Sequence, residues 1–218
     1  MAKIIRKLLI VEGSDDLSLI SAIMSSRVKN WNPRPKEFAV EIQLAGEDSR
    51  DGGKNKIESR RILGKLKSGN YNLTHLGIVV DADNSFKGAQ QKLQNIKNEI
   101  AQNPDHQNLK CEFWVMPDNN SDGMIEDLCL SLLKDRQTTL PLLDFATRKA
   151  VEAKNSHSAP YKSPAHNSKA SLKTWLAWQD EPGLRMGAAV HRNILDVNTP
   201  AIGPFLNWFC NFFELDKI

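Results

Sequence analysis

The chain has 218 residues, of which 40% are hydrophobic and 25% are charged, with a formal net charge of +3. This length and apolar content are enough for one substantial core, and we expect one domain with an appendage. The charge balance falls short of the strongly basic character that identifies a nucleic-acid-binding protein unaided. The apolar run at residues 8–11 is too short for a signal sequence, and no stretch approaches the ~20 apolar residues of a membrane span.

The cysteines Cys111, Cys129 and Cys210 are odd in number, far apart and embedded in apolar or amphipathic stretches. Their spacing fits neither a disulfide framework nor a zinc site. Buried thiols in a reducing compartment are the simplest interpretation, and we expect a soluble, cytoplasmic protein.

Short apolar runs alternate with segments of helical periodicity over the first part of the chain. The first run ends at Glu12, and Ser14 follows where a helix N-cap is expected. The expected strands are residues 7–11, 38–44, 76–80 and 112–116, and further helices are expected at residues 54–67 and 88–101. This alternation predicts an α/β fold: a Rossmann-like parallel sheet of about four strands, with helices on both faces and ligands at the carboxyl ends of the strands.

From residue 124 onward the periodicity is helical. We expect residues 1–135 to form the core and residues 136–218 to form a helical C-terminal extension packed on it. The polar segment 154–168 contains almost nothing to bury and predicts a loop. The strongly apolar residues 202–213 predict a last helix docked on the sheet.

Acidic residues follow three of the four expected strands: Glu12 after the first, Asp81 and Asp83 after the third, and Asp118 after the fourth. Because parallel strands bring their carboxyl ends to one edge, the first three should converge. Asp16, in the first turn of the following helix, can point to the same place. The alternative is that each acid only caps a helix start or a strand end.

Carboxylates packed together raise one another's pKa, so such a cluster persists most easily when a cation neutralises it. An all-oxygen ligand set with no nearby His or Cys favours Mg²⁺ or Mn²⁺ over zinc. The sequence therefore predicts a divalent metal site at Glu12, Asp16, Asp81 and Asp83.

Two of these stretches resemble the motifs of Toprim domains. LIVEGSDD at residues 9–16 resembles the first motif, in which a strand ends in a catalytic glutamate followed by glycine, and VVDAD at residues 79–83 resembles the second. The extra acid Asp16 is closer to the branch of overcoming-lysogenization-defect nucleases. Residues 115–128 and 169–179 also resemble an uncharacterised prokaryotic Toprim-related family. The resemblance implies a Toprim-like core, with the glutamate as general acid/base or metal ligand and the Asp-x-Asp pair as metal ligands.

The nuclease branch also uses further acids to bind a second metal ion, and a downstream lysine to stabilise the negative charge that develops on the phosphate. Here the resemblance implies Glu126 or Asp127 as the acids and Lys169 as the lysine, with Lys173 behind it on the same helix face. The alternative is that both lysines are ordinary surface residues. The basic helix expected at residues 54–67 suits a phosphate backbone, although a solvated helix face is the competing interpretation.

Together these features predict a Mg²⁺- or Mn²⁺-dependent nuclease acting on DNA or RNA, in phage defence or repair. A noncatalytic nucleic-acid- or nucleotide-binding module and a nucleotidyl-transfer enzyme remain alternatives. The chain has no phosphate-binding loop motif, so any partner ATPase must act in trans. The chain has only two tyrosines, Tyr71 and Tyr161, and neither lies in a recognisable strand-passage domain, which disfavours a topoisomerase. Trp175 and Trp178 are expected in the core rather than as base-stacking platforms.

Overall fold

A parallel sheet forms the centre of the chain because its strands carry apolar side chains on both faces. The computed structural model describes residues 5–31, 40–46, 57–68, 71–134, 136–162, 164 and 166–218. The strands run parallel in the order β2-β1-β3-β4. They are β1 (Ile5–Val11), β2 (Glu41–Leu44), β3 (Tyr71–Asp81) and β4 (Lys110–Met116). The predicted four-stranded α/β fold is confirmed.

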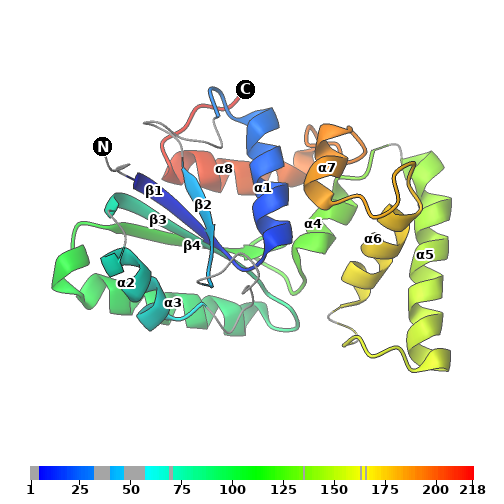
Figure 1. Ribbon diagram of the computed structural model, residues 1–218, viewed down its shortest axis with the longest axis horizontal. Helices are drawn as coiled ribbons and strands as arrows, with labels where there is room; N and C mark the ends of the chain where they lie inside the picture. The colour runs from blue at the N-terminus through cyan, green and yellow to red at the C-terminus, as the bar shows by residue number, and fades with distance from the viewer. Residues whose placement is uncertain are drawn as a thin grey trace.

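Helices cover both faces of this sheet (Figure 1). Alternation along β1 sends Leu9 and Val11 to one face, and Leu8 and Ile10 to the other. The first face packs against α1 (Ser14–Arg27) and α8 (Gly203–Phe212), and the second packs against α2 (Ser59–Ser68) and α3 (Phe86–Gln102). The apolar C-terminal segment therefore docks on the sheet as its sequence predicts.

The other helices extend the first layer beyond the sheet. They are α4 (Ile125–Ser131), α5 (Arg136–His157), α6 (Asn167–Ala177) and α7 (Met186–His191), with short 3-10 turns at Pro104–His106 and Pro200–Ile202. Helix α7, which the periodicity does not reveal, lies so close to α1 that a Cβ on Gly187 would sit 2.5 Å from the Ser18 carbonyl oxygen. The C-terminal helices thus share one hydrophobic cluster with α1 and the sheet.

Several predicted boundaries are wrong. Val40 precedes β2, residues 38 and 39 lie outside the described part of the chain, and β3 begins at Tyr71 rather than at residue 76. Residues 57 and 58 precede α2 rather than belonging to it, and residues 51–56 lie outside the described part of the chain. The predicted polar loop at 154–168 is shorter, because α5 continues to His157 and α6 begins at Asn167. Lys154 Nζ donates to the carbonyl oxygens of Ala159 at 3.0 Å and Tyr161 at 2.6 Å. These bonds hold the start of the connection against the end of α5.

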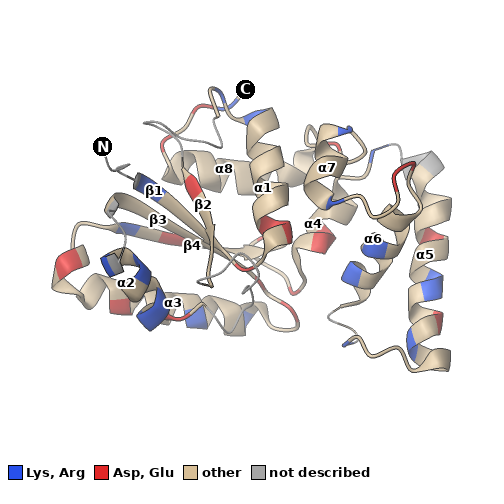
Figure 2. Cartoon of the chain, in the orientation of Figure 1, with Lys and Arg blue, Asp and Glu red and all other residues tan. Residues whose placement is uncertain are grey.

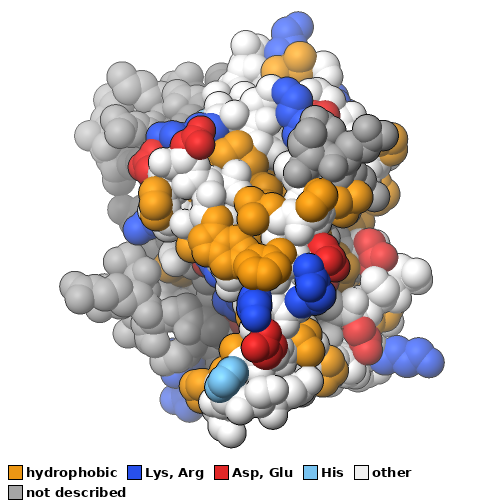
Figure 3. Space-filling view, turned by 90° about the vertical axis from the view of Figure 1, so that its right-hand side faces the viewer, with side chains coloured by type: hydrophobic (Ala, Val, Ile, Leu, Met, Phe, Trp, Pro, Cys, Tyr) orange, Lys and Arg blue, Asp and Glu red, His pale blue; other side chains and the backbone are white. Residues whose placement is uncertain are grey.

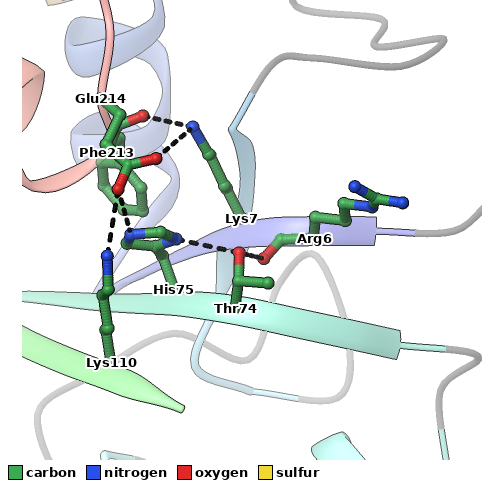
Figure 4. Close-up of polar contacts among 7 residues, drawn as sticks. All are labelled: Arg6, Lys7, Thr74, His75, Lys110, Phe213 and Glu214. Carbon is green, nitrogen blue, oxygen red and sulfur yellow. Dashed lines mark hydrogen bonds and ion pairs between the residues drawn. The ribbon is translucent and has the colours of Figure 1, made fainter. Parts of the chain in front are cut away.

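A polar cluster fastens the end of α8 to the amino-terminal edge of the sheet (Figure 4). Lys7 Nζ donates to the Phe213 carbonyl oxygen at 2.6 Å, and Lys110 Nζ donates to Glu214 at 3.0 Å. His75 Nε2 lies 3.4 Å from the same carboxylate, and burial lowers the pKa of His75. This edge of the sheet is therefore occupied by contacts that hold the fold together.

The three cysteines are all buried, and none forms a disulfide. Among the described residues, no helix combines the length and apolar character needed to cross a bilayer.

Two glycines provide a matched test of this packing. A Cβ on Gly77 in β3 would lie 2.7 Å from Phe213 Cζ and 2.8 Å from Leu9 Cδ1, whereas a Cβ on Gly64 in α2 would meet nothing within 4 Å. We expect Gly77→Ala to lower the free energy of unfolding by about 1–3 kcal/mol through overpacking. Gly64→Ala should raise it by roughly 0.5–1 kcal/mol, because alanine favours the helix. Urea denaturation measures both changes. An unchanged free energy of unfolding in Gly77→Ala would contradict the close contact of β3 with Phe213, which directly follows α8.

Candidate metal centre

The strand order makes a topological switch point at the carboxyl ends of β1 and β3. The chain leaves β1 for α1 on one face and leaves β3 for α3 on the other, so the two connections diverge (Figure 1). Open α/β sheets bind ligands at such a switch point. Val11 pairs with Val79 at these strand ends, Glu12 follows directly, and Asp81 closes β3. Two of the predicted acids thus come from neighbouring strand ends.

Asp16 joins these acids from the first turn of α1. Its Oδ2 accepts the Gly13 N–H at 3.0 Å, which satisfies one free donor at the helix start. A Cβ on Gly13 would lie 3.0 Å from that oxygen, so the glycine makes room for the carboxylate. The other oxygen, Oδ1, is buried without a hydrogen-bond donor among the described residues. The Asp16 side chain is 6% exposed.

Asp81 and Glu126 meet where α4 begins. Asp81 Oδ1 accepts the Ile125 N–H at 2.8 Å, which ties the end of β3 to the first residue of α4. The next residue, Glu126, is fully buried, and its Oε2 has no hydrogen-bond donor in the described part of the chain. A buried carboxylate with an unsatisfied oxygen is costly, and few such groups persist without a function.

The four carboxylates of Glu12, Asp16, Asp81 and Glu126 act on one another electrostatically. Burial, followed by the charge of Glu12, raises the pKa of Asp16 from 3.8 to about 7. Burial, followed by the charges of Asp16, Glu12 and Glu126, raises the pKa of Asp81 well above its ordinary value. We call these four side chains the acidic cluster.

The donors of the acidic cluster are all carboxylate oxygens, the ligand type that hard divalent cations prefer, and at least two of these oxygens are buried without a hydrogen-bond donor among the described residues. Among the described residues, no three His, Cys, Asp or Glu side chains are already grouped around one position that could hold a metal ion. Mg²⁺ usually keeps several waters and takes only one or two carboxylates directly, so three preformed protein ligands are not required.

Asp83 has a clear backbone role. Its φ is +53°, its N–H donates to the Gly123 carbonyl at 2.8 Å, and its carbonyl accepts the Gly123 N–H at 2.9 Å. These bonds join the loop after β3 to the loop after β4. The proposed role of the Asp83 carboxylate as a metal ligand stays a prediction.

The structure separates Glu126 from its neighbour Asp127. Asp127 Oδ2 accepts the Met124 N–H at 2.7 Å and so caps α4. Asp127 Oδ1 accepts the hydroxyl of Ser168 in α6. Both Asp127 oxygens are therefore engaged in holding helices, whereas Glu126 lies in the acidic cluster. The acids after β4 are also structural: Asp118 accepts from Ser121, and Asp122 accepts the Phe86 N–H at the start of α3.

Lys169 brings a positive charge to the acidic cluster. Its Nζ lies 3.4 Å from Glu126 Oε1, and its side chain is 45% exposed. Burial lowers the pKa of Lys169, but the neighbouring acids, Glu126 first and then Asp81 and Asp15, outweigh this effect, and the net pKa is raised. Lys173, one turn further along α6, pairs with Asp15 of α1 at 2.6 Å. Helix α6 is thus fixed to the starts of both α1 and α4.

Asp15 and Ser168 anchor α6, a role that their positions in the sequence do not indicate. Each lies beside a predicted site residue, but only the packing of α6 reveals its partner. Basic side chains also lie on α2, α3 and α5 (Figure 2). Of those on α2, Lys65 donates to the Leu44 carbonyl at 2.6 Å and holds the end of β2, while Arg60 and Lys67 line an open depression of about 440 Å³ between α2 and α3.

The raised pKa of Asp16 sets a pH dependence for the metal-free protein. A carboxyl whose folded pKa lies above its unfolded value contributes stability that is present below pH 3.8 and is lost as the pH rises through about 7. We therefore expect the melting temperature in EDTA to fall between pH 5 and pH 8. Mn²⁺ should raise it more at pH 8 than at pH 5, because a cation binds the ionised cluster. Asp16→Asn should flatten the slope in EDTA, and an unchanged slope would contradict this origin.

In comparisons with known proteins, no curated protein and no solved structure matches the chain. One family model does match, over residues 6–214, and it is described as a protein of unknown function, DUF3226. Because the match covers nearly the whole chain, including the acidic cluster and helices α5 to α8, the chain belongs to the DUF3226 family.

Proposed function

We propose that this chain is a divalent-metal-dependent nuclease that hydrolyses phosphodiester bonds in DNA or RNA. The observation that carries the proposal is Glu126, a fully buried carboxylate whose charge acts on two other buried acids and which has an oxygen without a donor among the described residues. Structural caps do not explain this arrangement, because a cap needs only one acid and a backbone N–H. Acidic side chains that repel one another are retained where their charges neutralise a bound cation.

The residues that would hold Mg²⁺ or Mn²⁺ are Glu12, Asp16, Asp81 and Glu126, with Asp83 as a predicted addition. Bound divalent cations stabilise the attacking and leaving oxygens of an in-line phosphoryl displacement. Two features of the chain keep the ligands in place. The Ile125 N–H fixes Asp81, and the Gly13 N–H fixes Asp16, so each acid leaves its second oxygen for another partner.

We assign Lys169 the role of stabilising the negative charge that develops on the phosphate. It is half-exposed while its ammonium remains near Glu126, so it can contact a phosphate beside the acidic cluster. A preorganised cation at that point is most valuable in the transition state, where negative charge grows on the phosphoryl oxygens. Lys173, by contrast, is occupied by Asp15 and serves to position α6.

The proposal follows the Toprim resemblance of the two acidic motifs, and we place the protein in the cytoplasm, in phage defence or repair. Three buried, unpaired cysteines suit a reducing compartment. Any ATPase partner would act in trans. If purified protein binds nucleic acid tightly but never cuts it with Mg²⁺ or Mn²⁺, the noncatalytic module replaces this proposal.

The neighbouring acids Glu126 and Asp127 give a matched test. We expect Glu126→Gln to reduce Mn²⁺-dependent cleavage by at least about 10²-fold, as expected when an essential charge is removed from a catalytic site. Asp127→Asn should cost about 1 kcal/mol of stability, because it weakens the cap of α4, while the Mn²⁺ affinity is retained. Cleavage of plasmid and single-stranded substrates, calorimetric titration with Mn²⁺ and thermal unfolding provide the readouts. Asp81→Asn and Glu12→Gln should behave like Glu126→Gln.

Lys169 and Lys173 form a second matched pair on α6. Lys169→Ala should lower saturated turnover by about 10²-fold with a smaller change in KM, because it removes charge stabilisation specific to the transition state. Lys173→Ala should affect stability more than turnover, since it breaks only the pair with Asp15. Steady-state kinetics of both variants decide the assignment. Unchanged turnover in Lys169→Ala would remove that residue from the catalytic group.

A further inference from the structure

The ammonium group of Lys169 occupies one side of the acidic cluster. Its Nζ forms an ion pair with Glu126 Oε1 at 3.4 Å, and Asp81 is the next acid that acts on its charge. The other oxygen of Glu126, Oε2, is buried and has no hydrogen-bond donor among the described residues. Glu126 therefore has one oxygen on the ammonium and one oxygen left for a metal ion.

The acids of the cluster act on one another with different strengths. After burial, the charge of Glu12 raises the pKa of Asp16 more than the charge of Glu126 does. After burial, the charges of Asp16 and Glu12 raise the pKa of Asp81 more than the charge of Glu126 does. Because the interaction between charges weakens with distance, Glu12, Asp16 and Asp81 form the inner group of the cluster. Glu126 lies to one side of this group, where Lys169 meets it.

Helix α6 is held on both sides of Lys169. Ser168 donates its hydroxyl to Asp127 Oδ1, and Lys173 Nζ pairs with Asp15 at 2.6 Å. The second oxygen of Asp127 accepts a backbone N–H at the start of α4. Asp127 is therefore unavailable as a ligand for a second metal ion, and the same contact holds the start of α6 beside the cluster.

The packing of α6 also fixes its rotation about its own axis. Leu172 and Trp175 are fully buried, whereas Trp178, directly after the helix, is 42% exposed and lies with its ring centroid 5.7 Å from that of Phe145 in α5. The prediction that both tryptophans belong to the core is therefore correct for Trp175 and wrong for Trp178. Hydrophobic side chains gather on the outer face that carries α5, with charged side chains beside them (Figure 3). Rotation of α6 would expose its buried residues, so Lys169 keeps its side toward the cluster.

We propose that the Lys169 ammonium takes the place of a second metal ion, so that the acidic cluster binds a single divalent cation. This inference rests on the proposed metal-dependent function and adds its metal stoichiometry. Two-metal catalytic sites hold their cations about 3.5–4 Å apart and use both to stabilise the reacting oxygens. A metal ion on Glu126 Oε1 would lie against the ammonium, and like charges this close repel strongly where water screens them poorly.

The competing arrangement has Lys169 turned into solvent and a second metal ion on the oxygen that it leaves. Its side chain is 45% exposed, so such a movement needs no rearrangement of the core. The two arrangements differ in the number of metal ions that the protein binds. They can therefore be distinguished without nucleic acid and without any cleavage.

The experiment counts bound Mn²⁺ by calorimetric titration and by electron paramagnetic resonance, with Asp81→Asn as the background for ions bound elsewhere. The wild type should bind one Mn²⁺ per chain. Lys169→Met keeps the length of the side chain without its charge, and it should bind a second Mn²⁺ at least about tenfold more tightly than the wild type does. Lys169→Arg should bind one. Lys173→Met is the matched control and should also bind one, because Lys173 pairs with Asp15 outside the cluster.

The location of the second ion has its own readouts. Two Mn²⁺ ions in one cluster are close enough for their spins to couple, and we expect the coupled signal in Lys169→Met but not in the wild type. Adding Glu126→Gln to Lys169→Met should remove the second ion, because the oxygen that Lys169 leaves is then no longer charged. Circular dichroism checks that each variant is folded, and Lys169→Gln replaces Lys169→Met if the methionine variant does not fold.

The outcomes separate this inference from the function on which it rests. Two spin-coupled Mn²⁺ ions in the wild type overturn the inference, and a wild type that cuts nucleic acid in that state keeps the nuclease. A folded Lys169→Met that still binds one ion with wild-type affinity also overturns it. One ion in the wild type and two in Lys169→Met, in a protein that never cuts with Mn²⁺, support the inference and reject the nuclease. A wild type that binds no Mn²⁺ above the Asp81→Asn background rejects both.

Discussion

The mutual repulsion of buried carboxylates is the constraint on which the rest of this structure depends. Asp16, Asp81 and Glu126 lie where water cannot screen them, and the charge of Glu12 adds to the repulsion. The fold holds them there because the two central strands end side by side, α1 starts directly after one, and α4 is tied to the end of the other. A protein selected only for stability would replace some of these acids with apolar residues.

The C-terminal helices complete this site rather than merely lengthening the chain. Helix α6 is held by Ser168 on Asp127 and by Lys173 on Asp15, and both contacts involve acids in the first turn of another helix. Lys169 lies between these two anchors, on the Glu126 carboxylate. Asp15 and Asp127, in the first turns of α1 and α4, thus help to position Lys169 at the acidic cluster.

Much of the fold and part of the site could be predicted from the sequence. Continuous apolar runs mark β1, β3 and β4, and the convergence of the acids that follow the two central strands is expected from the geometry of parallel sheets. Helix α7 cannot be predicted in this way, because six residues are too few for a periodic signal. Glu126 and Asp127 could not be separated, because adjacent helical residues differ by only about 100° in direction and the phase depends on packing. Trp175 and Trp178 pose the same problem, since burial of one and exposure of the other is decided by where α6 ends.

The central claim is that the acidic cluster holds a divalent cation, and a crystal structure grown with Mn²⁺ tests it most directly through anomalous scattering. The account predicts an anomalous peak bonded to carboxylate oxygens of Asp81 and at least one of Glu12, Asp16 and Glu126, and its loss in Asp81→Asn crystals. The claim would be contradicted if crystals grown with Mn²⁺ showed no anomalous peak between these side chains, or showed a peak only at another site.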